Sequence, residues 1–334
     1  MPEYPSHLPL FPTYQSQSRQ PLRSTTMPGP TPQLDHIIIH LPLEQLDSPP
    51  KWLTDAFTIS PGGTHGDGKT TNKLIVFADG TYIELLAFTS PAARVDHWWG
   101  DKGYGIVDYA FTLPAAGPGV AGADAGAQGY EHIRTRLDAA QPALAAVGRA
   151  GLLPSALRSG SRAKPDGDRI EWHVAFPLPE CRGRAPFWCF DVTPRERRVP
   201  VDKAATTHPS GALAVGSLSV FVADEGGEER AALLQVLDAS VPFDAGPDGV
   251  EVRLDESTWE LATPRKIESH VPCQLFVVGA REGSGEMAAL RDRGRGLAAR
   301  LTLFTGPGAG ERGRIQERVG EEGDEVFIGF TANM

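Results

Sequence analysis

The residues best suited to chemistry in this chain are a histidine and a glutamate on two strands that flank a glycine-rich loop. His36 lies in the segment 33–40, whose β-branched residues and flanking prolines predict a strand. Glu84 lies in the segment 82–88, which follows an Asp-Gly turn. A carboxylate inside an apolar strand is costly unless it is paired, hydrogen-bonded or bound to a cation. Glu84 is therefore either a site residue or turned to solvent, and we expect it and His36 to be catalytic.

The loop between these strands, from Pro61 to Asn72, holds two further candidates. His65 is either a surface histidine or a residue that lines the site. Asn72 either caps the loop or turns its amide toward a ligand. We expect both to bind substrate. His40 shares a strand face with His36 because side chains alternate along a strand, and a core or rim position is expected for it.

The elements around these residues repeat along the chain. A short helix from the Pro49-Pro50 pair, a strand from Thr58 and a hairpin of 73–77 with 82–88 complete the first unit. A second unit has a strand at 105–113, a helix at 130–140 and strands at 169–176 and 186–193, with a Gly/Ala-rich insertion at 114–128. Asp108 occupies the place in the second unit that His36 holds in the first. The repeat predicts paired modules whose curved sheets close around a cleft.

Several ordered blocks of sequence carry a family resemblance. "LDHIIIHLP" and "DGTYIELLAF" open and close a β-α-β-β-β unit that resembles one module of the vicinal oxygen chelate superfamily. "FTISPGGTHGDGKTTNKLIVFADGTYIELLAF", "HWWGDKGYGIVDYAFTL" and "APFWCFDVTPRERRVP" more specifically resemble the glyoxalase-like domain proteins. The resemblance covers about residues 34–223 and implies an α+β fold of paired βαβββ modules.

The resemblance also implies a metal site, because metal ligands in this superfamily come from the first and last strands of each module. They carry over as His36, Glu84 and Asp108, which suit a divalent ion such as Zn²⁺, Mn²⁺ or Fe²⁺. The fourth place falls on Phe190, which cannot bind a metal, although Cys189 or Asp191 would substitute if the strand register shifts by one. The alternative is a site without metal that binds an organic ligand. Arg195 either holds a substrate carboxylate or is a solvated turn residue.

These residues and the resemblance together favour an enzyme that acts on a small α-hydroxy or α-keto carbonyl compound by metal-assisted proton transfer, as an isomerase or lyase. One alternative is a metal-free protein that binds or sequesters a small molecule. Another is a ring-cleaving dioxygenase, which ranks lower because it needs two histidines and a carboxylate around iron, and only one clear histidine is in place.

Composition limits the other classes of function. The chain has 334 residues, 40% of them hydrophobic, and a net charge of −10, which argues against a nucleic-acid partner. No apolar run is long enough to cross a membrane. Three cysteines without metal-finger spacing fit a reducing compartment, so the cytoplasm is expected. A leader at 1–33 reads as disordered; it would direct the protein to mitochondria if it is a transit peptide, and either Met1 or Met27 is the start.

The remainder of the chain, 201–334, is expected to form an α+β extension after the paired-module domain of 34–200. A strand at 216–222, a helix at 228–239 and strands at 251–254 and 259–262 predict a degenerate βαββ unit. Further strands are expected at 273–279, 300–304 and 326–330, with loops between them. A structural extension or a homodimer surface is the predicted role of this region.

Overall fold

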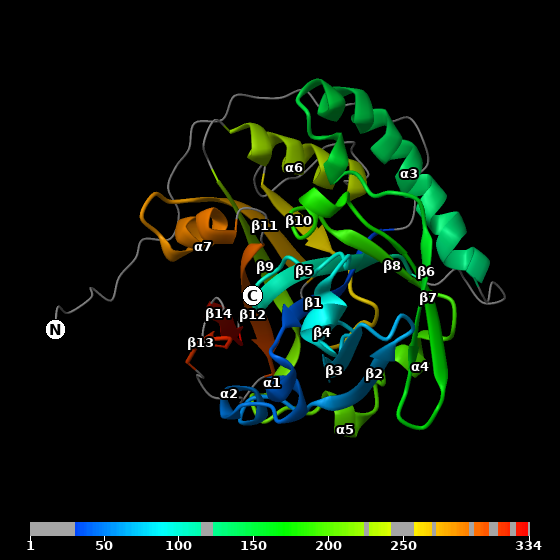
Figure 1. Cartoon of the computed structure of the whole chain (residues 1–334), viewed down its shortest axis with the longest axis vertical. Helices are drawn as coiled ribbons and strands as arrows, with labels where there is room; N and C mark the ends of the chain where they lie inside the picture. Colours follow the sequence, from blue (N-terminus) through cyan, green and yellow to red (C-terminus); the bar gives the residue numbers. More distant parts are fainter. Residues whose placement is uncertain are drawn as a thin grey trace.

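Eight strands from the first two thirds of the chain close into one barrel. The computed structural model describes residues 31–114, 123–223, 227–241, 257–268, 272–293, 297–306, 313–320 and 325–332. The barrel strands follow the order β1-β4-β3-β2-β6-β7-β8-β5 (Figure 1). Their bounds are β1 Gln33–His40, β2 Ser60–His65, β3 Thr70–Val76, β4 Tyr82–Phe88, β5 Gly105–Thr112, β6 Arg158–Ala163, β7 Arg169–Ala175 and β8 Phe187–Asp191.

The barrel consists of two βαβββ modules, as the sequence predicts. In the first, β1 pairs in parallel with β4, and α1 (Leu43–Asp47) and α2 (Lys51–Thr54) connect β1 to β2. In the second, β5 pairs in parallel with β8, and α3 (Ala123–Ala146) connects β5 to β6. The two modules join through the antiparallel pair β1 and β5. First and last strands of each module are therefore neighbours, which brings residues distant in sequence onto one wall.

The glycine-rich segment is more ordered than the loop predicted for 61–72. Its first half belongs to β2, and Asn72 lies within β3, opposite Gly63. A Cβ atom on Gly62 would lie 2.1 Å from both the carbonyl and the side-chain oxygen of Asn72, so only glycine fits there. The glycines are thus needed because two backbones approach closely, and the turn itself is short.

Helix α3 is also longer than the predicted helix of 130–140. It spans Ala123–Ala146 and continues past Pro142. One face is buried against the barrel, including Tyr130, Ile133, Leu137 and Leu144. The apolar spacing therefore continues beyond the segment on which the prediction was based. Residues 115–122 of the predicted insertion lie outside the described residues, as do 1–30 of the leader and the strand predicted at 251–254.

A second sheet follows the barrel, in the order β10-β11-β9-β12-β14-β13. Its strands are β9 Ala212–Ala223, β10 Thr258–Leu261, β11 Cys273–Ala280, β12 Ala298–Thr305, β13 Ile315–Arg318 and β14 Glu325–Thr331; the helices after the barrel are α4 Arg195–Arg198, α5 Lys203–Thr206, α6 Glu228–Ser240 and α7 Gly285–Arg293. Both α7 and β13 lie where loops were predicted. In each half of the sheet the first strand pairs in parallel with the last: β9 with β11, and β12 with β14.

One continuous apolar core joins the barrel wall to this sheet. Outward-facing Ile37 and Tyr109 of the barrel belong to the same buried cluster as Leu218 of β9 and Leu237 of α6. Helices α3 and α6 pack side by side over this core (Figure 1). The barrel interior holds two smaller clusters, one around Phe176 and one around Val199. Among the described helices, none has the length and apolarity needed to span a bilayer.

Candidate active site

A bulge in β1 turns two consecutive acid–base side chains toward each other. Leu34 lies opposite Phe111 and His36 opposite Ala110, so Asp35 is an extra residue in the ladder. Nδ1 of His36 lies 2.6 Å from Oδ2 of Asp35, and both side chains are buried. In a regular strand these neighbours would point to opposite faces. The bulge therefore gives His36 a carboxylate partner that alternation does not predict.

Asp35 is held ionised by two arginines. Arg198 donates to both of its carboxylate oxygens, at 2.9 and 3.1 Å, and Arg195 also pairs with it. Burial alone would raise the pKa of Asp35, but Arg195, Arg198 and His36 together hold it well below its ordinary value. A carboxylate only accepts hydrogen bonds, so Nδ1 of His36 carries the proton of this bond, and Nε2 points away from Asp35.

Glu84 lies beside Nε2 of His36, on the neighbouring strand β4. Its Oε2 lies 3.5 Å from Nε2 of His36, and its side chain is only 7% exposed. Its Oε1 accepts a hydrogen bond of 2.6 Å from Nδ2 of Asn72. Glu84 is thus buried with specific partners and is not turned to solvent, and its role as a site residue stays a prediction. The imidazole of His36 and the carboxylate of Glu84 therefore meet, as expected, from the neighbouring parallel strands β1 and β4.

His65 adds a second imidazole to Glu84. Its Nε2 lies 3.6 Å from Oε1 of Glu84, and its Nδ1 lies 2.6 Å from Oγ1 of Thr70. Burial lowers the pKa of His65, with Glu84 opposing that shift, so the ring is neutral near pH 7. At 17% side-chain exposure it is the most open member of the cluster. We call His36, His65, Asn72 and Glu84 the acid–base cluster.

Asn72 fixes the orientation of this cluster through its amide. While its Nδ2 donates to Glu84, its Oδ1 accepts from the backbone N–H of Gly63 at 3.1 Å and from Nη1 of Arg162 at 2.9 Å. The close passage of the glycines over Asn72 is what allows the first of these bonds. Asn72 is therefore a buried connector between Glu84 and Arg162, and its predicted contact with substrate stays a prediction.

Asp108 is engaged elsewhere in the barrel. Its Oδ2 lies 2.7 Å from Nη2 of Arg182 and accepts a bond of 2.8 Å from Nε1 of Trp99, while its Oδ1 accepts the N–H of Tyr109. Burial raises the pKa of Asp108, although Arg182 and Trp99 oppose that shift. Both oxygens are occupied, so the trio of His36, Glu84 and Asp108 does not fit a shared cation in this arrangement.

The last strand of the second module has the register shift that the sequence leaves open. Phe190 packs outward in the main core, whereas Cys189 belongs to the cluster inside the barrel. Asp191 pairs with Arg195 and Arg198. Arg195 also donates to the carbonyl of Gly80. Nη1 and Nη2 of Arg195 thus have protein partners, and its capture of a substrate carboxylate stays a prediction.

Metal binding also stays a prediction. Across the described ranges, no group of three or more His, Cys, Asp or Glu side chains has the arrangement of a metal site. His65 is a second imidazole beside Glu84, but the described His, Cys, Asp and Glu side chains form no metal-holding group, so the lower rank of ring cleavage stays a prediction.

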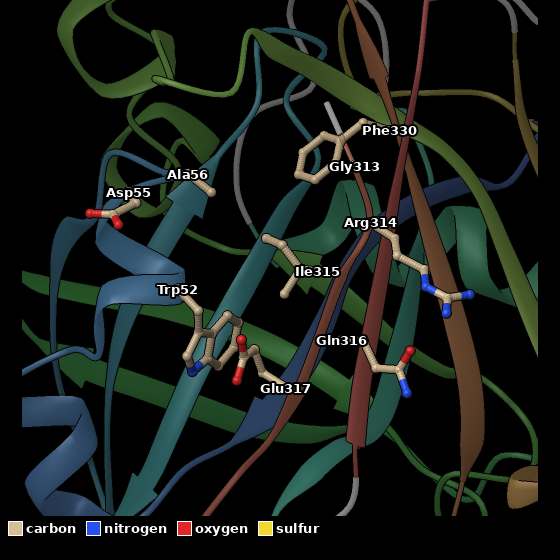
Figure 2. Close-up of a pocket in the computed structure, with 9 residues that line it drawn as sticks. All are labelled: Trp52, Asp55, Ala56, Gly313, Arg314, Ile315, Gln316, Glu317 and Phe330. Atoms are coloured by element: carbon tan, nitrogen blue, oxygen red, sulfur yellow. The ribbon is translucent and has the colours of Figure 1, made fainter. Parts of the chain in front are cut away.

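A groove of about 480 Å³ lies elsewhere, between α2 and the strands β13 and β14 (Figure 2). Trp52, Ile315 and Phe330 give it an apolar wall, and Asp55, Arg314 and Glu317 lie at its rim. It contains neither histidine nor cysteine and shares no residue with the acid–base cluster. The acid–base cluster in the barrel is therefore the candidate site, because acid, base and orienting groups converge there.

Comparison with known proteins agrees with this architecture. A crystal structure of a hypothetical protein from Staphylococcus aureus is similar over 90% of this chain and 100% of that chain, with a TM-score of 0.55 and 12% identity, which supports the fold alone. A family model described as a glyoxalase-like domain matches residues 34–237. The chain therefore belongs to the glyoxalase-like domain family of the vicinal oxygen chelate superfamily. A search of curated proteins finds no match.

Sequence reasoning missed three residues of the site: Asp35, Tyr82 and Arg162. Tyr82 stacks on His36 with ring centroids 4.7 Å apart and accepts a bond from Arg198. Asp35 precedes His36 directly in the sequence, but strand alternation places their side chains on opposite faces, and the sequence does not indicate the bulge that brings them together. Arg162 lies 90 residues from its partner Asn72, and no local pattern connects them.

Proposed function

We propose that the protein is an enzyme that moves a proton between adjacent carbons of a small α-hydroxy carbonyl compound. The observation that supports it best is the approach of Glu84 to His36, with Asp35 behind the imidazole. A general base, a second proton carrier and a group that orients it are what such a reaction requires. Membership of the glyoxalase-like family agrees with this class of chemistry but does not specify it.

The proposal gives a distinct role to each side chain. Glu84, held by Asn72, removes the proton from the carbon that bears the hydroxyl group and returns it to the neighbouring carbon. His36 accepts the hydroxyl proton at Nε2 and returns it to the neighbouring oxygen. The intermediate is an enediolate, no atom is lost, and the product is the isomeric hydroxycarbonyl compound. Asp35 stabilises the imidazolium that forms in between.

Turnover of a panel of hydroxycarbonyl compounds tests this proposal. We expect Glu84→Gln and His36→Gln each to reduce the rate by about 10²–10⁴-fold, the range for loss of a general acid or base. Glu44→Gln, at an exposed position in the first turn of α1, is the control and should leave the rate unchanged. Rates of Glu84→Gln and His36→Gln equal to that of the unchanged protein would contradict the proposal.

The divalent ion is tested in the same preparations. Metal content of the purified protein, with and without prior chelation, measures whether Zn²⁺, Mn²⁺ or Fe²⁺ is bound. We expect the proton-transfer rate to depend on Glu84 and His36 both before and after chelation. Tight binding of hydroxycarbonyl compounds without any turnover would instead support the small-molecule binding protein.

A further inference from the structure

A buried arginine beside the acid–base cluster has no ion-pair partner within 4 Å among the described residues. Of the arginines in the described ranges, Arg162, Arg182 and Arg198 are buried. Arg182 pairs with Asp108 at 2.7 Å, and Arg198 pairs with Asp35 and Asp191. Arg162 forms no ion pair with any described residue. Its guanidinium donates only to the Oδ1 of Asn72 and the backbone carbonyl of Arg198, at 2.9 and 3.2 Å.

An arginine in that position is costly for the folded protein. Burial lowers the pKa of Arg162, with Glu84 and Tyr82 opposing that shift, yet a guanidinium stays charged at any physiological pH. Its Nε is buried without a hydrogen-bond partner among the described residues. A buried charge that forms no ion pair destabilises the folded state. Groups perturbed in this way cluster at functional sites, where a ligand of opposite charge compensates them.

The position of Arg162 relative to the cluster indicates which ligand. A single side chain, Asn72, bridges Arg162 to Glu84 through bonds of 2.9 and 2.6 Å. Burial and the charge of Arg162 both keep the nearby ring of His65 neutral. A substrate whose reacting carbon lies next to Glu84 would therefore reach Arg162 with a second functional group, attached a few bonds from that carbon.

We infer that Arg162 anchors a carboxylate of the substrate, so that the substrate class is the small 2-oxo or hydroxy-2-oxo acids. This inference rests on the proposed function for the identity of the part of the substrate that reacts. Binding of the carboxylate by Arg162, however, can be measured without any reaction. Arg162 offers Nε to one carboxylate oxygen, and the planar guanidinium matches the two-oxygen geometry of that group. Neutral hydroxyketones would lack this contact and bind more weakly.

Binding of pyruvate and of its neutral amide, pyruvamide, to the full chain tests the inference by calorimetry. Neither probe has the adjacent hydroxyl needed for isomerisation, so turnover does not interfere. We expect pyruvate to bind at least tenfold more tightly than pyruvamide. Arg162→Gln should remove that preference, and Arg162→Lys should retain part of it. Arg158→Gln, on the exposed end of the same strand, is the matched control and should bind as the unchanged protein does.

The outcomes separate the inference from the proposed function. Equal affinity for the acid and the amide, or undetectable binding of pyruvate, would overturn the inference even if hydroxycarbonyl turnover is found. Preference for pyruvate that depends on Arg162, in a protein without turnover, would support the inference while the proposed function fails. If Arg162→Gln does not fold, the comparison of the two probes on the unchanged protein and on Arg162→Lys decides.

Discussion

At the scale of single residues, the site depends on how His36 is held. Asp35 fixes the proton on Nδ1, Tyr82 stacks against the ring and Glu84 lies beyond Nε2. A carboxylate behind a histidine sets both its tautomer and its orientation, and outer partners of this kind typically change activity 10–100-fold when removed. The adjacent residues Asp35 and His36 therefore act as one unit.

Replacement of Asp35 by asparagine separates orientation from stability. We expect Asp35→Asn to reduce turnover by about 10–100-fold and to lower the free energy of unfolding by about 3 kcal/mol, because Arg195 and Arg198 lose a counter-ion. Asp191→Asn is the matched control, since it removes a carboxylate from the same arginines but not from His36. It should lower stability similarly and leave turnover nearly unchanged. Equal losses of turnover in both variants would show that Asp35 has no specific role toward His36.

At the scale of elements, the β3–β4 hairpin connects the barrel to the second sheet. The N–H of Asp79 in its turn donates to Leu213, and its carbonyl accepts from the N–H of Arg265. The carboxylate accepts from Thr81 through Oδ1, but Oδ2 is buried without a partner among the described residues. Burial raises the pKa of Asp79 to about 7, although the bonds from Thr81 oppose that shift.

This hairpin predicts a pH dependence of stability. A carboxyl with a raised pKa binds its proton more tightly in the folded state, so its contribution favours folding at low pH and declines as pH rises from about 4 to about 7. Asp79→Asn mimics the protonated form, and we expect its stability relative to the unchanged protein to increase over that range, by at most about 4 kcal/mol. Thermal unfolding of both proteins from pH 5 to pH 8 measures the difference. Asp138→Asn, on the exposed surface of α3, should show none. A constant difference between Asp79→Asn and the unchanged protein would contradict this account.

At the scale of the whole molecule, barrel and second sheet share one core. Ile37 of β1 and Leu218 of β9 lie in the same buried cluster, and backbone hydrogen bonds such as that from Leu34 to Ala262 cross between the two parts. Separating the barrel from the second sheet would expose apolar surface on both, which is costly. We therefore expect the two parts to unfold together.

A cavity in the second sheet should therefore weaken the barrel. We expect Leu218→Ala to cost about 2–5 kcal/mol and to retain a single unfolding transition. Hydrogen exchange measured on peptides from β4 and from β11 should show the same loss of protection. Weakened protection of β11 alone, with β4 unchanged, would mean that the sheets unfold independently.

Much of the architecture follows from the sequence because strand periodicity and turn residues are local signals. The strands at Gln33–His40 and Tyr82–Phe88 have the bounds that the pattern predicts, and the paired modules follow from the repeat. The site is only partly predictable. His36 and Glu84 stand out as polar groups in apolar strands, but the bulge at Asp35 and the pairing of Asp108 with Arg182 depend on contacts between distant strands. The helix α7 was missed because its segment is rich in glycine and charge.

The most direct test of the central claim is the exchange of carbon-bound hydrogen in deuterated water. Hydroxypyruvate, which carries a hydroxyl group, a carbonyl group and a carboxylate, is incubated with the full chain, and deuterium at its hydroxyl-bearing carbon is followed by NMR. The account predicts enzyme-dependent incorporation that falls by about 10²-fold or more in Glu84→Gln. Incorporation at the same rate in the unchanged protein and in Glu84→Gln would contradict it.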